Sequence, residues 1–296
     1  MSESRSVFVL LPGRKEEVDH YQLLQEQEAI GAGRLHQLRV EVAWAPAFDQ
    51  LRVLKKRFLE PSPVDAVVFE PSSLSTMELL LRELRGRTGL LLLNAWGPAI
   101  EGAASSWGGA FPFGTVSTDH PAIGRIQGGQ LRAAAREASV LCVTGPRRSS
   151  AAQERLDALR ATVGDQAEII DTAAGEWTEA AGALAFGDWY RIFKSRDLSL
   201  AAVAAQSDEL AVGVSSAIRA LPDASHRAVL ERAKLFGVDA CPSYGRRLVD
   251  EGTLAASVTN PANTGLALRL LHDFWSAQQP LPLRSFTTPS PYPALG

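Results

Sequence analysis

The stretch AAVAAQSDELAVGV, residues 201–214, changes from apolar to polar and back again. Its beginning, together with Leu200, has the continuous apolar character of a strand that is covered on both faces. From Glu209 to Ala220 the apolar residues recur at helical spacing, so residues 206–209 mark a strand-to-helix turn. In an open parallel sheet such turns lie at the carboxyl ends of the strands, where ligands bind, and an oxygen-bearing side chain there can also cap the helix. This turn alone does not separate capping from binding.

The same alternation of apolar runs and helical patterns extends along the chain. The apolar runs are VFVLL, LRVEVAW, AVVFE and GLLLL in the first half, and SVLCVTG, AEIID, LAAVAA and KLFGVD in the second. Such an order is typical of a parallel sheet with helices on both faces. Because the plan occurs twice, with a break near residues 113–119, we predict an α/β protein of two doubly wound parallel-sheet lobes.

Composition limits the classes of protein to which the chain can belong. A length of 296 residues with 46% hydrophobic content is enough for two cores. A formal net charge of −3 and a pI near 6.0 provide no broad basic field, so we expect no nucleic-acid partner. The apolar run before Pro12 is too short for a signal-peptide core or a membrane span, so we also expect no direct membrane insertion.

The common signatures of catalysis are missing from the sequence. It has no phosphate-binding loop of the form GxxxxGK[ST], no GxSxG nucleophile elbow and no HExxH zinc helix. Its five histidines are scattered, and Cys142 and Cys241 show no CxxC spacing. We therefore expect no metal, no cofactor and no enzymatic activity, although an enzyme stays open as an alternative because catalytic groups converge in space.

Polar or aromatic residues recur just past the carboxyl ends of the predicted strands. If the two halves face each other across these ends, the groups converge on one cleft that contains carboxylate, amide, guanidinium and ring groups. Such a mixture suits a polyhydroxylated ligand, whose hydroxyls need donors and acceptors while its C–H faces lie against rings. The candidate residues are His20, Tyr21, Asn94, Trp96, Asp119, Arg155, Trp177, Ser207, Asp208, Asp239 and Asn260.

Five segments resemble, in order and spacing, the type I periplasmic binding proteins of the ribose-binding kind. They are TVSTDHPAIGRIQGGQL, VTGPRRSSAAQERLDALRA, AAVAAQSDELAVGV, FGVDACPSYGRRLVDEG and LAASVTNPANTG, and the resemblance spans about residues 7 to 288. The same core forms the effector domain of lactose-repressor-like transcription factors. The resemblance implies a three-crossing hinge between an N-terminal lobe, residues 1–116 plus 262–284, and a C-terminal lobe, residues 117–261 plus 285–296.

The resemblance also implies ligand-contact positions. His20 and Tyr21 fall near the family's paired aromatics, and Asn94 stands where sugar binders often have an Asp that is followed by Arg, here Ala95. In the second half Arg155 matches the arginine of an ER pair, Trp177 an aromatic near the next strand, Asp239 the acid of GVD, and Asn260 a Gln or Asn at a crossover. Asp119 matches an acid that supports the hinge, and Ser207 replaces the usual Asn before Asp208.

Each of these positions also has a purely structural interpretation. An arginine on an amphipathic helix, such as Arg155, is commonly a surface residue. Tyr21 and Trp177 could be core aromatics, and Asp239 and Asn260 could hold turns. At the opening stretch we expect Ser207 to contact the ligand and Asp208 to cap the following helix.

The resulting expectation is a solute-binding protein that closes around a small polar ligand, a sugar or sugar derivative. Its partner would be the permease of an ABC transporter or a sensor kinase. The runner-up is a cytosolic repressor-like effector domain, without a DNA-binding headpiece because six residues precede VFVLL. A two-lobed enzyme is the third alternative. The expected location is periplasmic if a signal peptide has been removed, and cytoplasmic if the sequence is native and complete.

Overall fold

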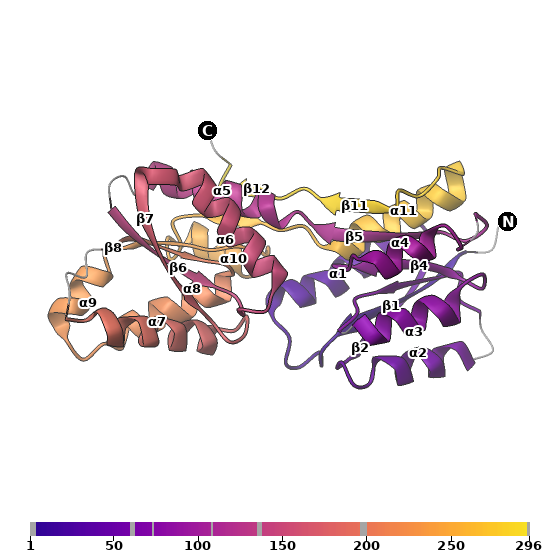
Figure 1. The fold of residues 1–296 in the computed structure, drawn as a ribbon, viewed down its shortest axis with the longest axis horizontal. Helices are drawn as coiled ribbons and strands as arrows, with labels where there is room; N and C mark the ends of the chain where they lie inside the picture. Colours follow the sequence, from indigo (N-terminus) through magenta and orange to yellow (C-terminus); the bar gives the residue numbers. More distant parts are fainter. Residues whose placement is uncertain are drawn as a thin grey trace. The chain divides into compact units, whose positions relative to one another are not determined.

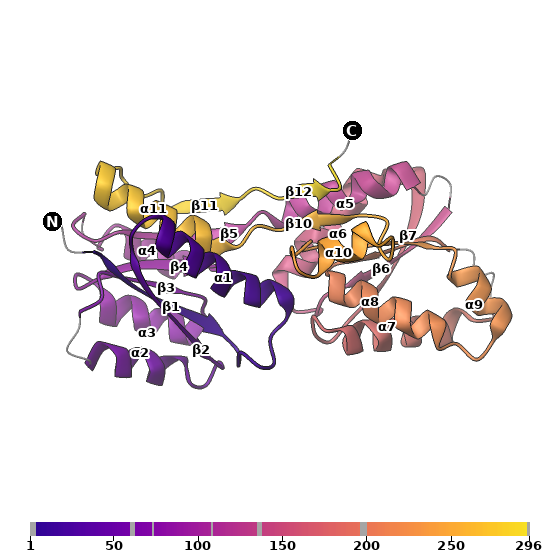
Figure 2. The ribbon, with the colours of Figure 1, turned by 180° about the vertical axis from the view of Figure 1, so that it is seen from behind.

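The chain forms two compact units in a computed structural model that describes residues 4–59, 63–72, 74–107, 109–134, 138–195 and 200–294 (Figures 1 and 2). Unit 1 contains Met1–Thr118 and Ala262–Thr287, and unit 2 contains Asp119–Pro261 and Thr288–Gly296. The chain therefore passes between the units after residues 118, 261 and 287, against the expected crossings after residues 116, 261 and 284.

Unit 1 is built on a six-stranded parallel sheet in the order β11-β5-β4-β3-β1-β2. From β1 the chain continues to β2 on one side and returns to β3 on the other, which is the doubly wound arrangement with its switch point at β1. The strands are β1 (Ser6–Pro12), β2 (Arg39–Ala45), β3 (Ala66–Phe69), β4 (Gly89–Leu93), β5 (Phe113–Thr118) and β11 (Arg284–Thr287).

Helices cover both faces of this sheet because its central strands are apolar on both sides. Alternate residues of β1 point to opposite faces, with Val7 and Val9 in one core cluster and Phe8 and Leu10 in the other. The first cluster packs against α1 and α11, the second against α2, α3 and α4. These helices are α1 (His20–Leu35), α2 (Gln50–Leu59), α3 (Leu74–Leu84), α4 (Pro98–Ala104) and α11 (Asn263–Ala277).

Unit 2 has a four-stranded parallel sheet in the order β7-β6-β8-β9, with a separate antiparallel pair, β10 and β12. Its strands are β6 (Ala138–Thr144), β7 (Ala167–Ala173), β8 (Leu200–Ala205), β9 (Lys234–Phe236), β10 (Ser257–Thr259) and β12 (Ser290–Tyr292). Its helices are α5 (His120–Ala134), α6 (Ser150–Val163), α7 (Glu179–Phe193), α8 (Asp208–Arg219), α9 (Ala224–Leu230) and α10 (Gly245–Asp250), with a 3₁₀ turn, η1, at Gly164–Gln166. The predicted α/β fold with two doubly wound parallel-sheet lobes is confirmed.

Small residues bring α5 and α6 into close contact in unit 2. A Cβ atom at Gly124 would lie 2.2 Å from the carbonyl oxygen of Arg155, and one at Gly128 would lie 2.7 Å from Thr162. Glycine at these positions therefore lets α6 approach α5 closely enough to fix the backbone at Arg155. From α5 the Gln127 side chain donates to the carbonyl of Ala205, at the end of β8, at 2.8 Å. The helix α5, against which α6 packs at Arg155, is thus tied to the edge of the sheet.

Within the described ranges, no helix is long and apolar enough to cross a membrane.

Candidate functional site

Asn94 organises a hydrogen-bond network at the carboxyl edge of the unit 1 sheet. It follows β4 directly and adopts a left-handed backbone conformation, φ 50°, which asparagine tolerates better than most residues. Its Nδ2 donates to Glu70 Oε1 at 3.1 Å, and its Oδ1 accepts from Asn263 Nδ2 at 2.9 Å and from the Thr118 amide at 3.3 Å. Asn94 is itself exposed, so the network opens onto the surface of the unit.

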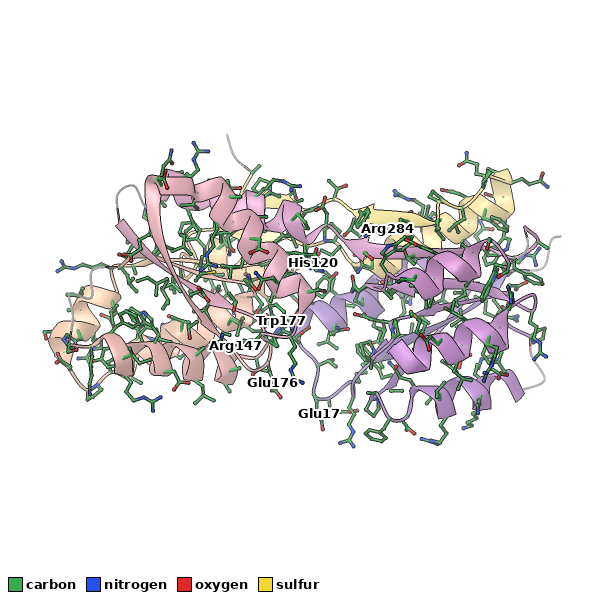
Figure 3. All side chains as sticks on the ribbon, in the orientation of Figure 1. Glu17, His120, Arg147, Glu176, Trp177 and Arg284 are labelled. Atoms are coloured by element: carbon green, nitrogen blue, oxygen red, sulfur yellow. The ribbon has the colours of Figure 1, made fainter. Side chains whose placement is uncertain are left out.

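Tyr21 reaches the same network from the first turn of α1. Its hydroxyl lies 3.4 Å from the Thr118 hydroxyl, which also accepts from Asn263 Nδ2 at 3.4 Å. Its neighbour His20 is the first residue of α1. Trp96 is placed differently, because its ring packs against the apolar face of the sheet and lies 4.3 Å from the guanidinium carbon of Arg284 (Figure 3, where Arg284 is labelled).

Glu70 belongs to this network and was missed in the sequence. The apolar run AVVFE includes Glu70 as its last residue, whereas β3 ends at Phe69 and Glu70 is the first residue after the strand. The rule that identified Asn94, a polar residue just past a buried strand, would have found it. Burial raises the pKa of the Glu70 carboxyl to about 7; the hydrogen bond from Asn94 opposes this shift, and the negative charge of Asp19 adds to it.

Arg155 occupies the corresponding edge of the unit 2 sheet and is nearly fully buried. Its Nη1 donates to the carbonyl of Gln206 at 2.7 Å, and its Nε donates to His120 Nδ1 at 3.3 Å. Burial, together with the positive charge of Arg155, lowers the pKa of His120 to about 3, so this imidazole is neutral and can accept the hydrogen bond. The guanidinium is therefore held in place by backbone and imidazole, unlike a solvated surface arginine.

Trp177 lies against the guanidinium of Arg155. The guanidinium carbon is 5.5 Å from the centroid of the indole, and the residue is partly exposed (Figure 3 labels Trp177 and His120). The ring also covers Gly145, the residue that follows β6, because a Cβ atom built there would lie 2.1 Å from the indole. The absence of a side chain at Gly145 is thus what allows the indole to pack against the end of β6.

Substitution of Gly145 by alanine is expected to push the indole of Trp177 off the end of β6. The added methyl group would overlap the ring, so the ring must move, and its contact with Arg155 must change with it. The tryptophan fluorescence spectrum should change, and sugar affinity should fall about tenfold. The Gly175→Ala variant is a matched control, because a Cβ atom at Gly175 meets no atom within 4 Å. Unchanged fluorescence and affinity in Gly145→Ala would contradict the prediction.

Asp239 and Asn260 form a buried pair beside Arg155. Asn260 Nδ2 donates to Asp239 Oδ1 at 3.0 Å, and Asp239 and the following Ala240 both have positive φ values, 99° and 41°. Burial raises the pKa of Asp239 to about 6, while the nearby charge of Arg155 and the hydrogen bond from Asn260 lower it. An unusual backbone turn thus holds a carboxyl group within the electrostatic reach of the arginine.

At the turn after β8, the roles of Ser207 and Asp208 differ from those expected. Ser207 caps α8, because its Oγ accepts from the amide of Leu210 at 3.1 Å. Asp208 is buried and accepts from the amide of Ala240 at 2.8 Å and from the Ser257 hydroxyl at 2.7 Å. The prediction that Asp208 caps the helix is therefore wrong. An N-cap residue has an extended backbone, which Ser207 has, with φ −147° and ψ 163°.

Replacement of Ser207 by alanine is expected to lower the free energy of unfolding by about 1 kcal/mol, the usual effect of losing an N-cap side chain. Since its hydroxyl is committed to Leu210, sugar affinity should change less than about twofold. Urea unfolding and calorimetry measure the two quantities separately. A loss of affinity without a loss of stability would restore Ser207 as a ligand contact.

Asp119 begins unit 2 directly after the first chain crossing. Its Oδ1 accepts from the amide of Ala122 at 2.8 Å, and Arg125 lies 3.9 Å from the same oxygen. The residue thus fixes the start of α5 at the point where the chain enters the unit. Its role in a hinge stays a prediction.

No group of three or more histidine, cysteine, aspartate or glutamate side chains is arranged to hold a metal ion in the part of the chain that the structure describes.

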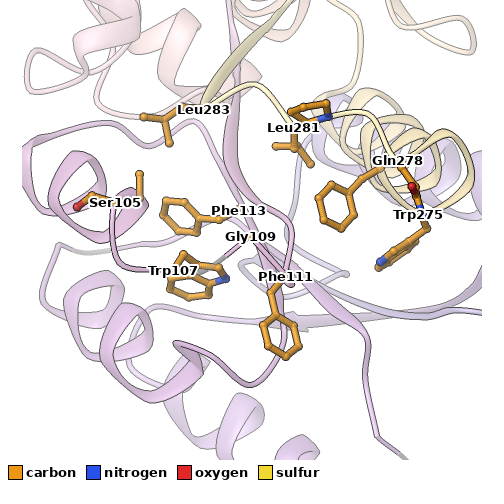
Figure 4. Close-up of a pocket in the computed structure, with 12 residues that line it drawn as sticks. Ser105, Trp107, Gly109, Phe111, Phe113, Trp275, Gln278, Leu281 and Leu283 are labelled. Carbon is orange, nitrogen blue, oxygen red and sulfur yellow. The ribbon is translucent and has the colours of Figure 1, made fainter.

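Unit 1 also contains an apolar hollow at the opposite edge of its sheet (Figure 4). It has a volume of about 770 Å³ and is lined by the aromatic rings of Trp107, Phe111, Phe113 and Trp275, next to the beginning of β5. The polar side chains in its lining are few, whereas a sugar needs several donors and acceptors. The hydrogen-bonding network around Asn94 suits a sugar better than this hollow does.

No protein-family model matches the chain, and no curated protein matches it in sequence. Solved structures do match it. A periplasmic ribose ABC transporter protein from Conexibacter woesei is 17% identical with a TM-score of 0.73, over 97% of this chain and 91% of that one. An ABC transporter periplasmic solute-binding protein from Actinobacillus succinogenes, with bound D-allose, is 13% identical with a TM-score of 0.77, over 97% of both chains.

A third similar structure is the fructose-binding periplasmic domain of a hybrid two-component system. It is 17% identical with a TM-score of 0.72, over 98% of this chain and 90% of that one. Since these matches cover nearly the whole of each chain, they confirm the predicted fold, that of the type I periplasmic binding proteins.

Proposed function

We propose that the chain is a solute-binding protein for a sugar or sugar derivative, without enzymatic activity. The observation that carries the proposal is the group around Arg155, in which a held guanidinium, the face of Trp177 and the carboxyl of Asp239 occur together. A planar guanidinium can bridge two adjacent hydroxyls, and an aromatic face suits the C–H side of a pyranose or furanose ring. Carboxyl groups accept the remaining hydroxyl protons.

The network around Asn94 is a second group of candidate ligand contacts, and it lies within unit 1. Tyr21 and Asn94 combine hydroxyl, amide and ring groups, as a polyhydroxylated ligand requires. Trp96, Ser207 and Asp208 are left out of the proposed contacts, because each is engaged in packing, capping or internal hydrogen bonds. The proposed ligand contacts are His20, Tyr21, Glu70, Asn94, Arg155, Trp177, Asp239 and Asn260.

The similar structures support a sugar as the ligand class and suggest two kinds of partner. Two of them belong to ABC transporters, named for ribose and holding D-allose, and one is the fructose-binding domain of a two-component system. The proposed partner is accordingly the permease of an ABC transporter or a sensor kinase.

Thermal-shift screening across monosaccharides, polyols and nucleosides tests the proposed function. A ligand at a hundred times its Kd adds about 2.7 kcal/mol of stability, which should raise the Tm by roughly 5 °C or more. Calorimetry on the responding compounds then gives Kd. If only nucleosides respond, or no compound does, the sugar-binding proposal is wrong. Conversion of a bound sugar, followed by NMR, would favour the two-lobed enzyme instead.

A further inference from the structure

The apolar hollow at the amino edge of the unit 1 sheet has the size and lining of a small-molecule site. Figure 4 shows Trp107, Phe111 and Phe113 on one side of it and Trp275 on the other. None of the described residues that line it is charged, and its volume of about 770 Å³ falls within the range of such sites, roughly 300–1,000 Å³. Phe111 and Trp275 are only partly buried, so a ligand can reach their rings. This lining suits an apolar group.

A second hollow at the same edge of the sheet is basic. It lies at the amino ends of β1, β2 and β3, has a volume of about 1300 Å³, and is lined by Arg5, Arg34 and Arg39 and by one acid, Asp65. Arg5 is paired with Asp65 at 2.6 Å. The side chains of Arg34 and Arg39 are exposed, and neither has an acidic partner in the described part of the chain. Two guanidinium groups are therefore available to an anion at this edge.

Trp275 joins the two hollows. It lines both of them, and the guanidinium carbon of Arg5 lies 5.7 Å from the centroid of its ring. The indole therefore has an uncharged, ring-lined space on one side and a group of guanidiniums on the other. A ligand that fills the first space and also reaches the arginines needs an apolar part and an anionic part.

We propose that this edge of unit 1 binds an anionic amphiphile with a phosphate head. Its apolar part would occupy the ring-lined hollow, and its phosphate would contact Arg34 and Arg39. Guanidinium groups bind phosphate oxygens bidentately, with charge-assisted hydrogen bonds roughly twice as strong as neutral ones. Burial of the apolar part adds affinity in proportion to its area. The site lies at the edge of the sheet opposite to Asn94, so this inference goes beyond the proposed sugar-binding function and does not depend on it.

Calorimetry with n-octyl phosphate tests the proposal, with inorganic phosphate and 1-octanol as its two halves. At pH 7.5 and below its micelle concentration, octyl phosphate should bind at least about tenfold tighter than either half. Binding should also change the tryptophan fluorescence, because Trp107 and Trp275 line the apolar hollow. The sugar identified by screening should not displace it, because the proposed sugar contacts in unit 1 lie at the other edge of the sheet.

One double variant tests the anionic part of the site. Arg34→Ala combined with Arg39→Ala should weaken the binding of octyl phosphate about tenfold or more, and both side chains are exposed, so the fold should be retained. The matched control is Arg219→Ala combined with Arg232→Ala, which removes two guanidiniums from a hollow of unit 2. This control should bind octyl phosphate like the wild type.

A single variant tests the apolar part. Phe111→Ala removes a partly exposed ring from the hollow and should weaken octyl phosphate binding about fivefold or more. Phe48→Ala removes an exposed ring from the loop after β2, outside the hollow, and should leave the affinity unchanged. Urea unfolding of both variants shows whether the fold is retained.

Four results would overturn the proposal. They are equal binding of octyl phosphate and one of its halves, wild-type affinity in the Arg34 and Arg39 double variant, loss of affinity in the unit 2 control, and displacement of octyl phosphate by the sugar. Vesicles of phosphatidylcholine with and without phosphatidic acid distinguish a free ligand from a lipid surface. Sedimentation of the protein with the acidic vesicles, without binding of octyl phosphate, would replace the proposed site by a membrane-surface contact.

Discussion

Replacing Arg155 by alanine is expected to weaken sugar binding by about 1.5 to 3 kcal/mol, or roughly tenfold to a hundredfold in Kd. The guanidinium is nearly fully buried and is held by the Gln206 carbonyl and by His120, so it meets a ligand without losing side-chain freedom. Its removal also takes away the cation that lies over Trp177. Calorimetry with the sugar identified by screening measures the loss.

Two further variants separate the role of Arg155 in binding from its role in the fold. Arg148 lies exposed in the loop before α6, so Arg148→Ala removes a nearby charge and should leave affinity unchanged. Arg155→Lys keeps the charge without the planar fork and should recover only part of the affinity. Urea unfolding of each variant shows whether the fold has changed. Wild-type affinity in Arg155→Ala would mean that the arginine only ties α6 to the backbone at Gln206.

The fold could be predicted from the sequence because its main elements are long enough to show a period. The apolar run at residues 200–205 predicts a strand and forms β8, Leu200–Ala205. The helical spacing after it predicts a helix and forms α8, Asp208–Arg219. The strand β12 has three residues, one of them a proline, and is too short for periodicity to reveal it. The last two strands of the chain, β11 and β12, pair with β5 and β10, which belong to different sheets.

The candidate site was less predictable, because side-chain direction depends on residues far away in the sequence. Asp208 turns inward since Gly237 and Gly245 leave room for its carboxyl group, and a Cβ atom at either position would lie within about 2 Å of one of its oxygens. Nothing within the stretch 201–214 carries that information. Glu70 was missed for a simpler reason. The end of a strand is uncertain by one or more residues when it is predicted from sequence, and a shift of one residue decides whether Glu70 ends β3 or follows it.

Replacing Asp208 by alanine is expected to lower the free energy of unfolding by about 3 kcal/mol, well above the effect of losing a helix cap. The carboxyl group accepts hydrogen bonds from the Ala240 amide and the Ser257 hydroxyl inside unit 2. In the alanine variant both of these donors would lose their acceptor. The substitution also leaves a void next to Gly237 and Gly245. Urea unfolding measures the loss.

Asp208→Asn is the variant that identifies the cause of this loss. The asparagine oxygen can accept from the Ala240 amide while its amide donates to the Ser257 oxygen, whose own proton can rotate away, so the loss should stay below about 1 kcal/mol. Burial, and next the charge of Asp239, raises the pKa of Asp208 above its usual range. The folded state therefore favours the protonated acid, and wild-type stability should decline as pH rises from the unfolded-state pKa through the folded-state pKa. Asp208→Asn should lack this part of the decline. Equal losses in the alanine and asparagine variants would show that ionised charge, rather than the two hydrogen bonds, is what the fold requires at this position.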